Sequence, residues 1–171
     1  SVGANLKQIR PVLEAGDFKA LDGVINDFQQ ASQAIKHAQI PVITAVQNMA
    51  LGGGCEFVMH SPRAVVALES YIGLVEAGVG LIPAGGGCME FARRAARAAE
   101  ASATKDPMNF LQSVFQTIAM AQVATSAVEA IAIPMTSLRI SKFPLCIRLE
   151  ARAVSIFSPR TRQAVNALLV L

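Results

Sequence analysis

"PVITAVQNMALGGGCEFVMH" is the sequence of residues 41–60, and this stretch decides the fold. Residues 42–46 form a β-branched apolar run that is too short for a helix, and they predict an interior strand. The triplet Gly52-Gly53-Gly54 predicts a tight turn. A helix is expected to begin at Cys55 and to run through His60. A strand, a glycine turn and a helix therefore follow one another directly.

The regions on either side predict further elements of both kinds. After Asp17, apolar residues recur at three- and four-residue steps, which predicts an amphipathic helix that crosses back to the strand. Farther along we expect a strand over 63–68, a glycine-rich loop over 73–87, a helix from Cys88, and a helix over 108–127 whose apolar stripe holds Leu111, Val114, Phe115 and Ile118. This order indicates a mixed α/β fold with helical crossovers.

Composition separates the chain into two parts. The 171 residues are 53% hydrophobic and 16% charged, which suits one globular core and excludes a disordered chain. Residues 1–130 carry nine basic and eleven acidic side chains, whereas residues 131–171 carry six basic and one acidic. Proline interrupts every apolar run of this second part, and neither a helical nor a strand-like hydrophobic period persists. We therefore predict a core over 1–130 and an atypical basic tail over 131–171, for which no regular element is expected.

Several classes of site and location are not expected. The basic tail lacks aromatic interleaving and any binding motif, so we do not expect nucleic-acid binding. The three cysteines lack CxxC spacing and indicate a reducing, cytoplasmic compartment, with Cys55 and Cys88 expected to be buried. The two histidines lack metal-ligand spacing, so no metal is expected. Polar residues break the longest uncharged stretches, which argues against a membrane span.

Two acidic residues and one glycine triplet are candidates for chemistry. Glu56 follows the triplet, and Glu76 lies in an apolar, glycine-rich setting. Carboxylates in apolar clefts have raised pKa values, which suits acid/base catalysis. The alternatives are a helix-terminal carboxylate for Glu56 and a solvent-facing loop acid for Glu76. The triplet itself predicts either an oxyanion hole or only a tight turn.

Other motifs favour less specific interpretations. Residues 78–83 have proline where a dinucleotide-binding fingerprint needs its third glycine, and residues 80–87 lack the Lys-Ser/Thr of a P-loop. The sequence therefore does not support nucleotide binding by either motif. Arg93, Arg94 and Arg97 favour a solvated helix face, with phosphate binding as the alternative.

Four ordered motifs together resemble the crotonase superfamily. They are GANLK at 3–7, PVITAV at 41–46, ALGGGCE at 50–56, and GLVE at 73–76 with IPAGGG at 82–87. The chain is most similar to enoyl-CoA hydratases, in particular the hydratase part of bifunctional 3-hydroxyacyl-CoA dehydrogenases. The resemblance covers residues 1–130 and implies an α/β ClpP/crotonase-like spiral of ββα units.

The resemblance also implies an activity and its residues. The amides of Ala4 and Gly53 would hold a thioester oxygen while Glu56 and Glu76 handle water and its protons. Lys7 matches a position near the CoA ribose-phosphate, and Ala84 one whose amide holds the water. The implied reaction is hydration of the 2,3 double bond of enoyl-CoA in fatty acid β-oxidation. No cofactor is bound, because coenzyme A is part of the substrate. The implied partners are further copies in a trimer-based assembly, or a dehydrogenase domain.

The chain departs from this family in three places. The opening strands of the domain are missing, so we expect an N-terminally truncated fold. Asn48 replaces a usual glycine and is expected to adopt a left-handed conformation. The basic tail replaces a helical end, and we hypothesise a reading-frame change near Ala130. The alternatives to hydration are isomerisation of a 3-enoyl-CoA, or an inactive remnant that acts only by association.

Overall fold

The computed structural model describes residues 1–40, 42–133 and 138–140. The helices are α1 (Leu6–Glu14), α2 (Phe18–Lys36), α3 (Gly53–His60), α4 (Gly87–Glu100), α5 (Met108–Ala119) and α6 (Ala127–Ala132), with a 3-10 helix η1 (Glu76–Val79). The strands are β1 (Ile43–Val46), β2 (Met49–Leu51), β3 (Arg63–Val66), β4 (Tyr71–Gly73), β5 (Val123–Ala124) and β6 (Leu138–Ile140). The helices expected after Asp17 and near Cys88, and the strand expected after residue 62, are thus present.

The strands are stacked as successive turns of a spiral. In the first turn β1 and β2 lead into α3, and in the second β3 and β4 lead through η1 into α4. β1 pairs in parallel with β3, and β2 pairs in parallel with β4. β6 extends the first sheet beside β3, and β5 extends the second beside β4. Repeated ββα units stacked in register form the expected spiral.

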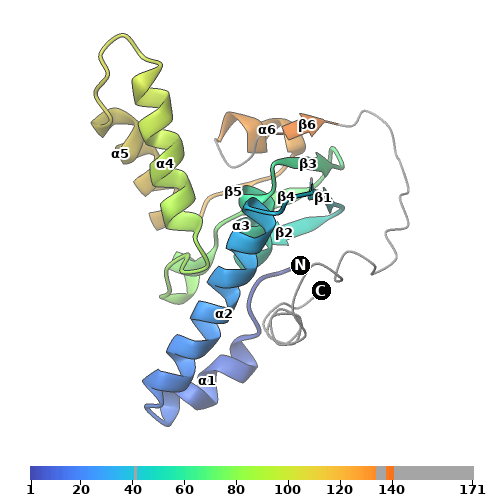
Figure 1. The fold of residues 1–171 in the computed structure, drawn as a ribbon, viewed down its shortest axis with the longest axis vertical. Helices are drawn as coiled ribbons and strands as arrows, with labels where there is room; N and C mark the ends of the chain where they lie inside the picture. Colours follow the sequence, from blue (N-terminus) through green and yellow to red (C-terminus); the bar gives the residue numbers. More distant parts are fainter. Residues whose placement is uncertain (41, 134–137, 141–171) are drawn as a thin grey trace.

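Two helical pairs flank these sheets. Figure 1 shows α1 against α2 at one end of the molecule and α4 against α5 at the other, with α3 between the pairs. The Asp17 side chain starts α2 by accepting a hydrogen bond from the Ala20 amide at 2.9 Å. α1 was not anticipated from the sequence, in which Pro11 argues against a helix.

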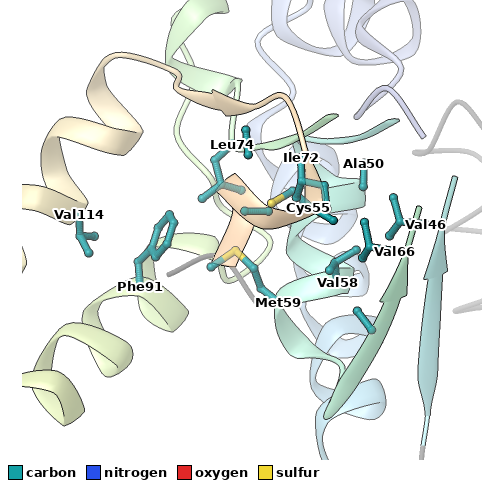
Figure 2. Packing of buried hydrophobic residues seen from close by; sticks show 14 of the residues in the cluster. Val46, Ala50, Cys55, Val58, Met59, Val66, Ile72, Leu74, Phe91 and Val114 are labelled. Atoms are coloured by element: carbon teal, nitrogen blue, oxygen red, sulfur yellow. The ribbon is translucent and has the colours of Figure 1, made fainter. Parts of the chain in front are cut away.

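The main core lies around α3. Cys55, Val58 and Met59 belong to one buried apolar cluster with Phe91 of α4 and Val66 of β3 (Figure 2). Each of these five side chains is at most 3% exposed. Burial of an apolar side chain of this size stabilises a fold by about 1.5–3 kcal/mol. The cluster therefore holds α3 firmly between the sheet and α4.

Five expectations about local structure need correction. Among the described strands β1 lies at an edge, pairs only with β3, and begins at the exposed Ile43. The helix expected over 108–127 ends at Ala119, because Ala121 adopts a φ of 47° and the amides of Ala121 and Gln122 donate back to the Ile118 and Thr117 carbonyl oxygens. Its stripe is also different, since Val114 is buried but Leu111 and Phe115 are exposed.

The remaining two corrections concern a thiol and the tail. Cys55 is buried as expected, whereas Cys88 is exposed at the start of α4. The tail contains a strand at 138–140, because β3 has a free edge with which β6 pairs. Residues 141–171 lie outside the described residues. No helix in the described ranges combines the length and the apolar character that a membrane crossing requires.

The turn between the first two strands confirms the expectation for Asn48. Its φ is 72°, a left-handed conformation that asparagine tolerates better than most residues. The Asn48 carbonyl then accepts a hydrogen bond from the Tyr71 amide at 2.6 Å, which ties the turn to β4. The asparagine is therefore compatible with the tight connection from β1 to β2.

Two glycine substitutions test the packing of this fold. At Gly73 a Cβ would lie 2.6 Å from the Gln122 carbonyl oxygen, so Gly73→Ala must separate β4 from β5. We expect it to lower the free energy of unfolding by about 1–3 kcal/mol. Gly23→Ala is the matched control, because no atom lies within 4 Å of its Cβ and it should stabilise α2 by about 1 kcal/mol. Urea denaturation measures the free energy of unfolding of both variants. Equal changes in the two variants would contradict the close contact of Gly73 with the Gln122 carbonyl oxygen.

Candidate active site

Glu56 is buried at the start of α3 and receives backbone hydrogen bonds from a distant loop. Its side chain is 3% exposed, and Oε1 accepts a hydrogen bond from the Gly87 amide at 2.9 Å. The Gly85 amide also donates to this carboxylate. A methyl group at Gly85 would overlap both Glu56 and the Phe28 ring, so only glycine fits there. The loop of residues 85–87 thus fixes the carboxylate in place.

Burial changes the acidity of Glu56. Removal from water raises its pKa to about 7, and the negative charge of Glu76 adds to this rise. The Gly87 and Gly85 amides stabilise the ionised carboxylate and so oppose this rise in pKa. A carboxyl group with this pKa can both accept and release a proton near neutral pH.

Glu76 enters the same region from the next turn of the spiral. Paired residues of β1 and β3, such as Ile43 and Arg63, are twenty residues apart, and so are the two glutamates. Burial raises the pKa of Glu76, although its own amide and that of Val75 oppose this. Its Oε2 is buried and has no hydrogen-bond partner in the described part of the chain. A ligand or a proton at this oxygen would satisfy it.

The backbone around the glycine triplet brings two amides to this region. Gly52 has a φ of 53°, and a Cβ there would lie 3.1 Å from Glu76 Oε1 and 3.5 Å from the Gly3 Cα. The segment that contains Ala4 is therefore adjacent to the start of α3. Because Gly53 is the first residue of α3, its amide has no acceptor within the helix.

One apolar cavity of about 210 Å³ joins these groups. Five of the six candidate residues line it, namely Ala4, Gly53, Glu56, Glu76 and Ala84. Lys7 does not line the cavity and is exposed on α1. The side chains of Glu56 and Glu76 therefore meet in a single cleft, and the solvent-facing alternative for Glu76 is wrong.

Sequence reasoning missed the apolar wall of this cavity. Helices α1 and α2 and the loop after η1 supply it through Ile9, Leu13, Leu21, Val24, Ile25, Phe28, Leu81 and Ile82. Phe28 also stacks on Phe57 of α3, with ring centroids 4.7 Å apart. The amphipathic period after Asp17 was the available signal, but it could not indicate that this face would border a cavity. The described residues hold no group of three or more metal-binding side chains.

Comparison with known proteins identifies the family of this chain. Residues 2–111 match the family described as enoyl-CoA hydratase/isomerase. The chain belongs to the enoyl-CoA hydratase/isomerase family. A solved structure has the same fold as this chain. The enoyl-CoA hydratase from Shewanella pealeana aligns with a TM-score of 0.63 at 22% identity, and the alignment covers 83% of this chain and 47% of that protein.

Curated proteins are also similar to this chain in sequence. A "Probable 3-hydroxyacyl-CoA dehydrogenase" of Bacillus subtilis is 44% identical over 129 residues, which are 75% of this chain and 16% of that protein. A "Probable enoyl-CoA hydratase" of Rhizobium meliloti is 32% identical over 98 residues, which are 57% of this chain and 36% of that protein. The chain thus spans about a sixth to a third of the length of these relatives.

The raised pKa of Glu56 predicts a pH-dependent stability. The folded chain holds this proton up to about pH 7, whereas the unfolded chain releases it near 4.5, so stability should fall as pH rises through this window. Glu56→Gln should remove much of the fall, up to about 3 kcal/mol. Urea denaturation of both proteins from pH 5 to 8 measures how the free energy of unfolding depends on pH.

The comparison between variants isolates this contribution. Burial lowers the pKa of His60, which works in the opposite direction over part of the window but is common to both proteins. Glu69→Gln, at an exposed acid, should reproduce the wild-type pH profile. A Glu56→Gln profile that parallels the wild type would contradict the raised pKa.

Proposed function

We propose that this chain is an enoyl-CoA hydratase that adds water across the 2,3 double bond of an enoyl-CoA thioester. The observation that carries the proposal is the meeting of Glu56 and Glu76 in one apolar cavity, beside the backbone of Ala4 and Gly53. Hydration needs a group that removes a proton from water and a group that supplies one to carbon. Two carboxyl groups with raised pKa values suit this pair of tasks.

The thioester oxygen is the group that the backbone amides would hold. Attack of water at C3 moves electrons toward the thioester and leaves negative charge on its oxygen. In our proposal the amides of Ala4 and Gly53 donate to that oxygen, with α3 adding the positive end of its dipole. Loss of one such donor typically costs about 3 kcal/mol of transition-state stabilisation.

The two glutamates then divide the proton transfers. Glu56, held by the Gly87 amide at 2.9 Å, accepts a proton from water as the water oxygen bonds to C3. Glu76, whose pKa is raised by burial, donates a proton to C2. Together the steps add one water molecule to the double bond, and a proton transfer back to Glu76 restores the starting state.

Two further residues would contact other parts of the substrate. The exposed position of Lys7 on α1 suits a ribose-phosphate of CoA that remains at the surface. Ala84 lines the cavity, and its carbonyl oxygen accepts a hydrogen bond from Gln29 Nε2 at 2.7 Å, which restrains the loop. We propose that the Ala84 amide helps to hold the attacking water. No metal or bound cofactor takes part in this proposal.

The names of two relatives support a proposal about the metabolic role of this chain. A protein of Rickettsia felis, 40% identical over 90 residues, is named as a fatty acid oxidation complex trifunctional enzyme, and the Bacillus subtilis relative is named as a dehydrogenase. We therefore propose a role in fatty acid β-oxidation in the cytoplasm, with this chain representing the hydratase part of a larger dehydrogenase. A trimer-based assembly, or association with a dehydrogenase domain, remains our expectation for its partners.

Turnover of crotonyl-CoA tests the proposed function. We expect the purified chain to consume it, with loss of absorbance of the conjugated thioester. Glu56→Gln and Glu76→Gln should each lower kcat by about 10²- to 10⁴-fold, because each removes one proton-transfer group and keeps the side-chain size. Glu69→Gln, at an exposed acid outside the cavity, serves as the matched control.

The same assay separates hydration from its alternatives. A 3-enoyl-CoA that is converted while crotonyl-CoA is not hydrated would indicate an isomerase. A folded wild-type chain without turnover of either substrate would indicate an inactive remnant. Full activity in both glutamine variants would show that the site assignment is wrong.

A further inference from the structure

A second cavity lies at the opposite end of α3. Its volume is about 520 Å³, and it shares no lining residue with the apolar cavity that contains Glu56 and Glu76. Glu90, Arg93, Arg94 and Arg97 line it at helical spacing along α4, and Lys36 reaches it from the end of α2. Residues at positions i, i+3, i+4 and i+7 share one helix face. One stripe of α4 therefore directs its charges into this cavity.

The charges of this stripe do not cancel. The Glu90 carboxylate is fully buried, forms an ion pair with Lys36, and accepts a hydrogen bond from Arg93 at 2.7 Å. Burial alone would raise its pKa, but these hydrogen bonds lower it to about 2, so it is ionised. Among the described residues that line this cavity, four side chains are cationic and one, Glu90, is anionic, so the described lining is positively charged.

Arg93 and Arg94 are not part of a solvated helix face, whereas Arg97 is exposed. The Arg94 side chain is 16% exposed and donates to the Met59 carbonyl oxygen at 2.7 Å, at the end of α3. Arg93 is partly buried, and its Nε has no hydrogen-bond partner among the described residues. A buried donor without an acceptor costs free energy, which an anion beside it would recover. The remaining arginine, Arg97, is exposed at the rim.

We propose that this cavity binds the phosphate group of a small phosphorylated organic molecule. Guanidinium groups match the oxygens of phosphate through paired hydrogen bonds, and a phosphate dianion offsets most of the excess charge. A single phosphate would fill little of 520 Å³, whereas pockets of this volume hold small organic ligands. Met59 and Ile131 supply apolar contacts for the organic part.

Calorimetric titration of the full chain tests this site directly. The probes are inorganic phosphate and glycerol 3-phosphate, at an ionic strength held constant with potassium chloride. We expect saturable binding of both, with the ester tighter than phosphate. Arg97→Gln should weaken both about tenfold, and it is the safer variant because no ion pair of Arg97 is present in the described structure.

Two further variants make the test decisive. Arg93→Gln should also weaken binding, with circular dichroism confirming that it folds despite losing a contact to Glu90. Arg10→Gln, on the exposed face of α1, removes the same charge outside the cavity and should bind both probes like the wild type. Absence of saturable binding, or equal affinities in Arg97→Gln and the wild type, would overturn the proposal. Equal weakening in Arg10→Gln would overturn it too, since the effect would then be that of overall charge.

Discussion

The burial of the Glu56 carboxylate against a loop without side chains is the constraint on which this structure depends. A charged group can be buried only if hydrogen-bond donors accompany it, and here the amides of Gly85 and Gly87 are those donors. The amides can approach only because these positions lack a Cβ. The same requirement sets the path of the loop, the start of α4 at Gly87 and the packing of Phe28 on α3.

The spiral explains why two acids distant in sequence meet. Parallel pairing of β2 with β4 places the segments that follow these strands side by side, so η1 with Glu76 lies beside the start of α3 with Glu56. The sequence could predict this pair because both acids lie in unusual glycine-rich contexts. It could also predict α2 and α3, because period and turn residues are local signals. The expected turn at 52–54 is shorter than predicted, since α3 begins at Gly53 rather than at Cys55. The likeness to a family supplied the order in which these elements stack.

Other features could not be predicted, since they depend on partners distant in the chain. Helical period shows that α5 has an apolar face but not which part of that face meets α4, and so it could not indicate that Phe115 of the predicted stripe is exposed. A β-branched run predicts a strand but not its neighbours, and β1 lies at an edge of the described sheet. The apolar wall of the cavity that contains Glu56 and Glu76 is formed where α1 and α2 meet the loop after η1, a contact without any local signal.

The two ends of α3 show how environment decides the chemistry of one residue type. At the first end Glu56 and Glu76 lie in an apolar cavity, and burial outweighs the few amides that favour their ionised forms, so their pKa values rise. At the other end Glu90 is buried at least as deeply, yet Arg93 and Lys36 donate to it and its pKa falls. Depth of burial therefore does not decide protonation by itself. The decisive difference is whether cationic donors are buried with the acid, and this separates a pair suited to proton transfer from a fixed charge that organises arginines.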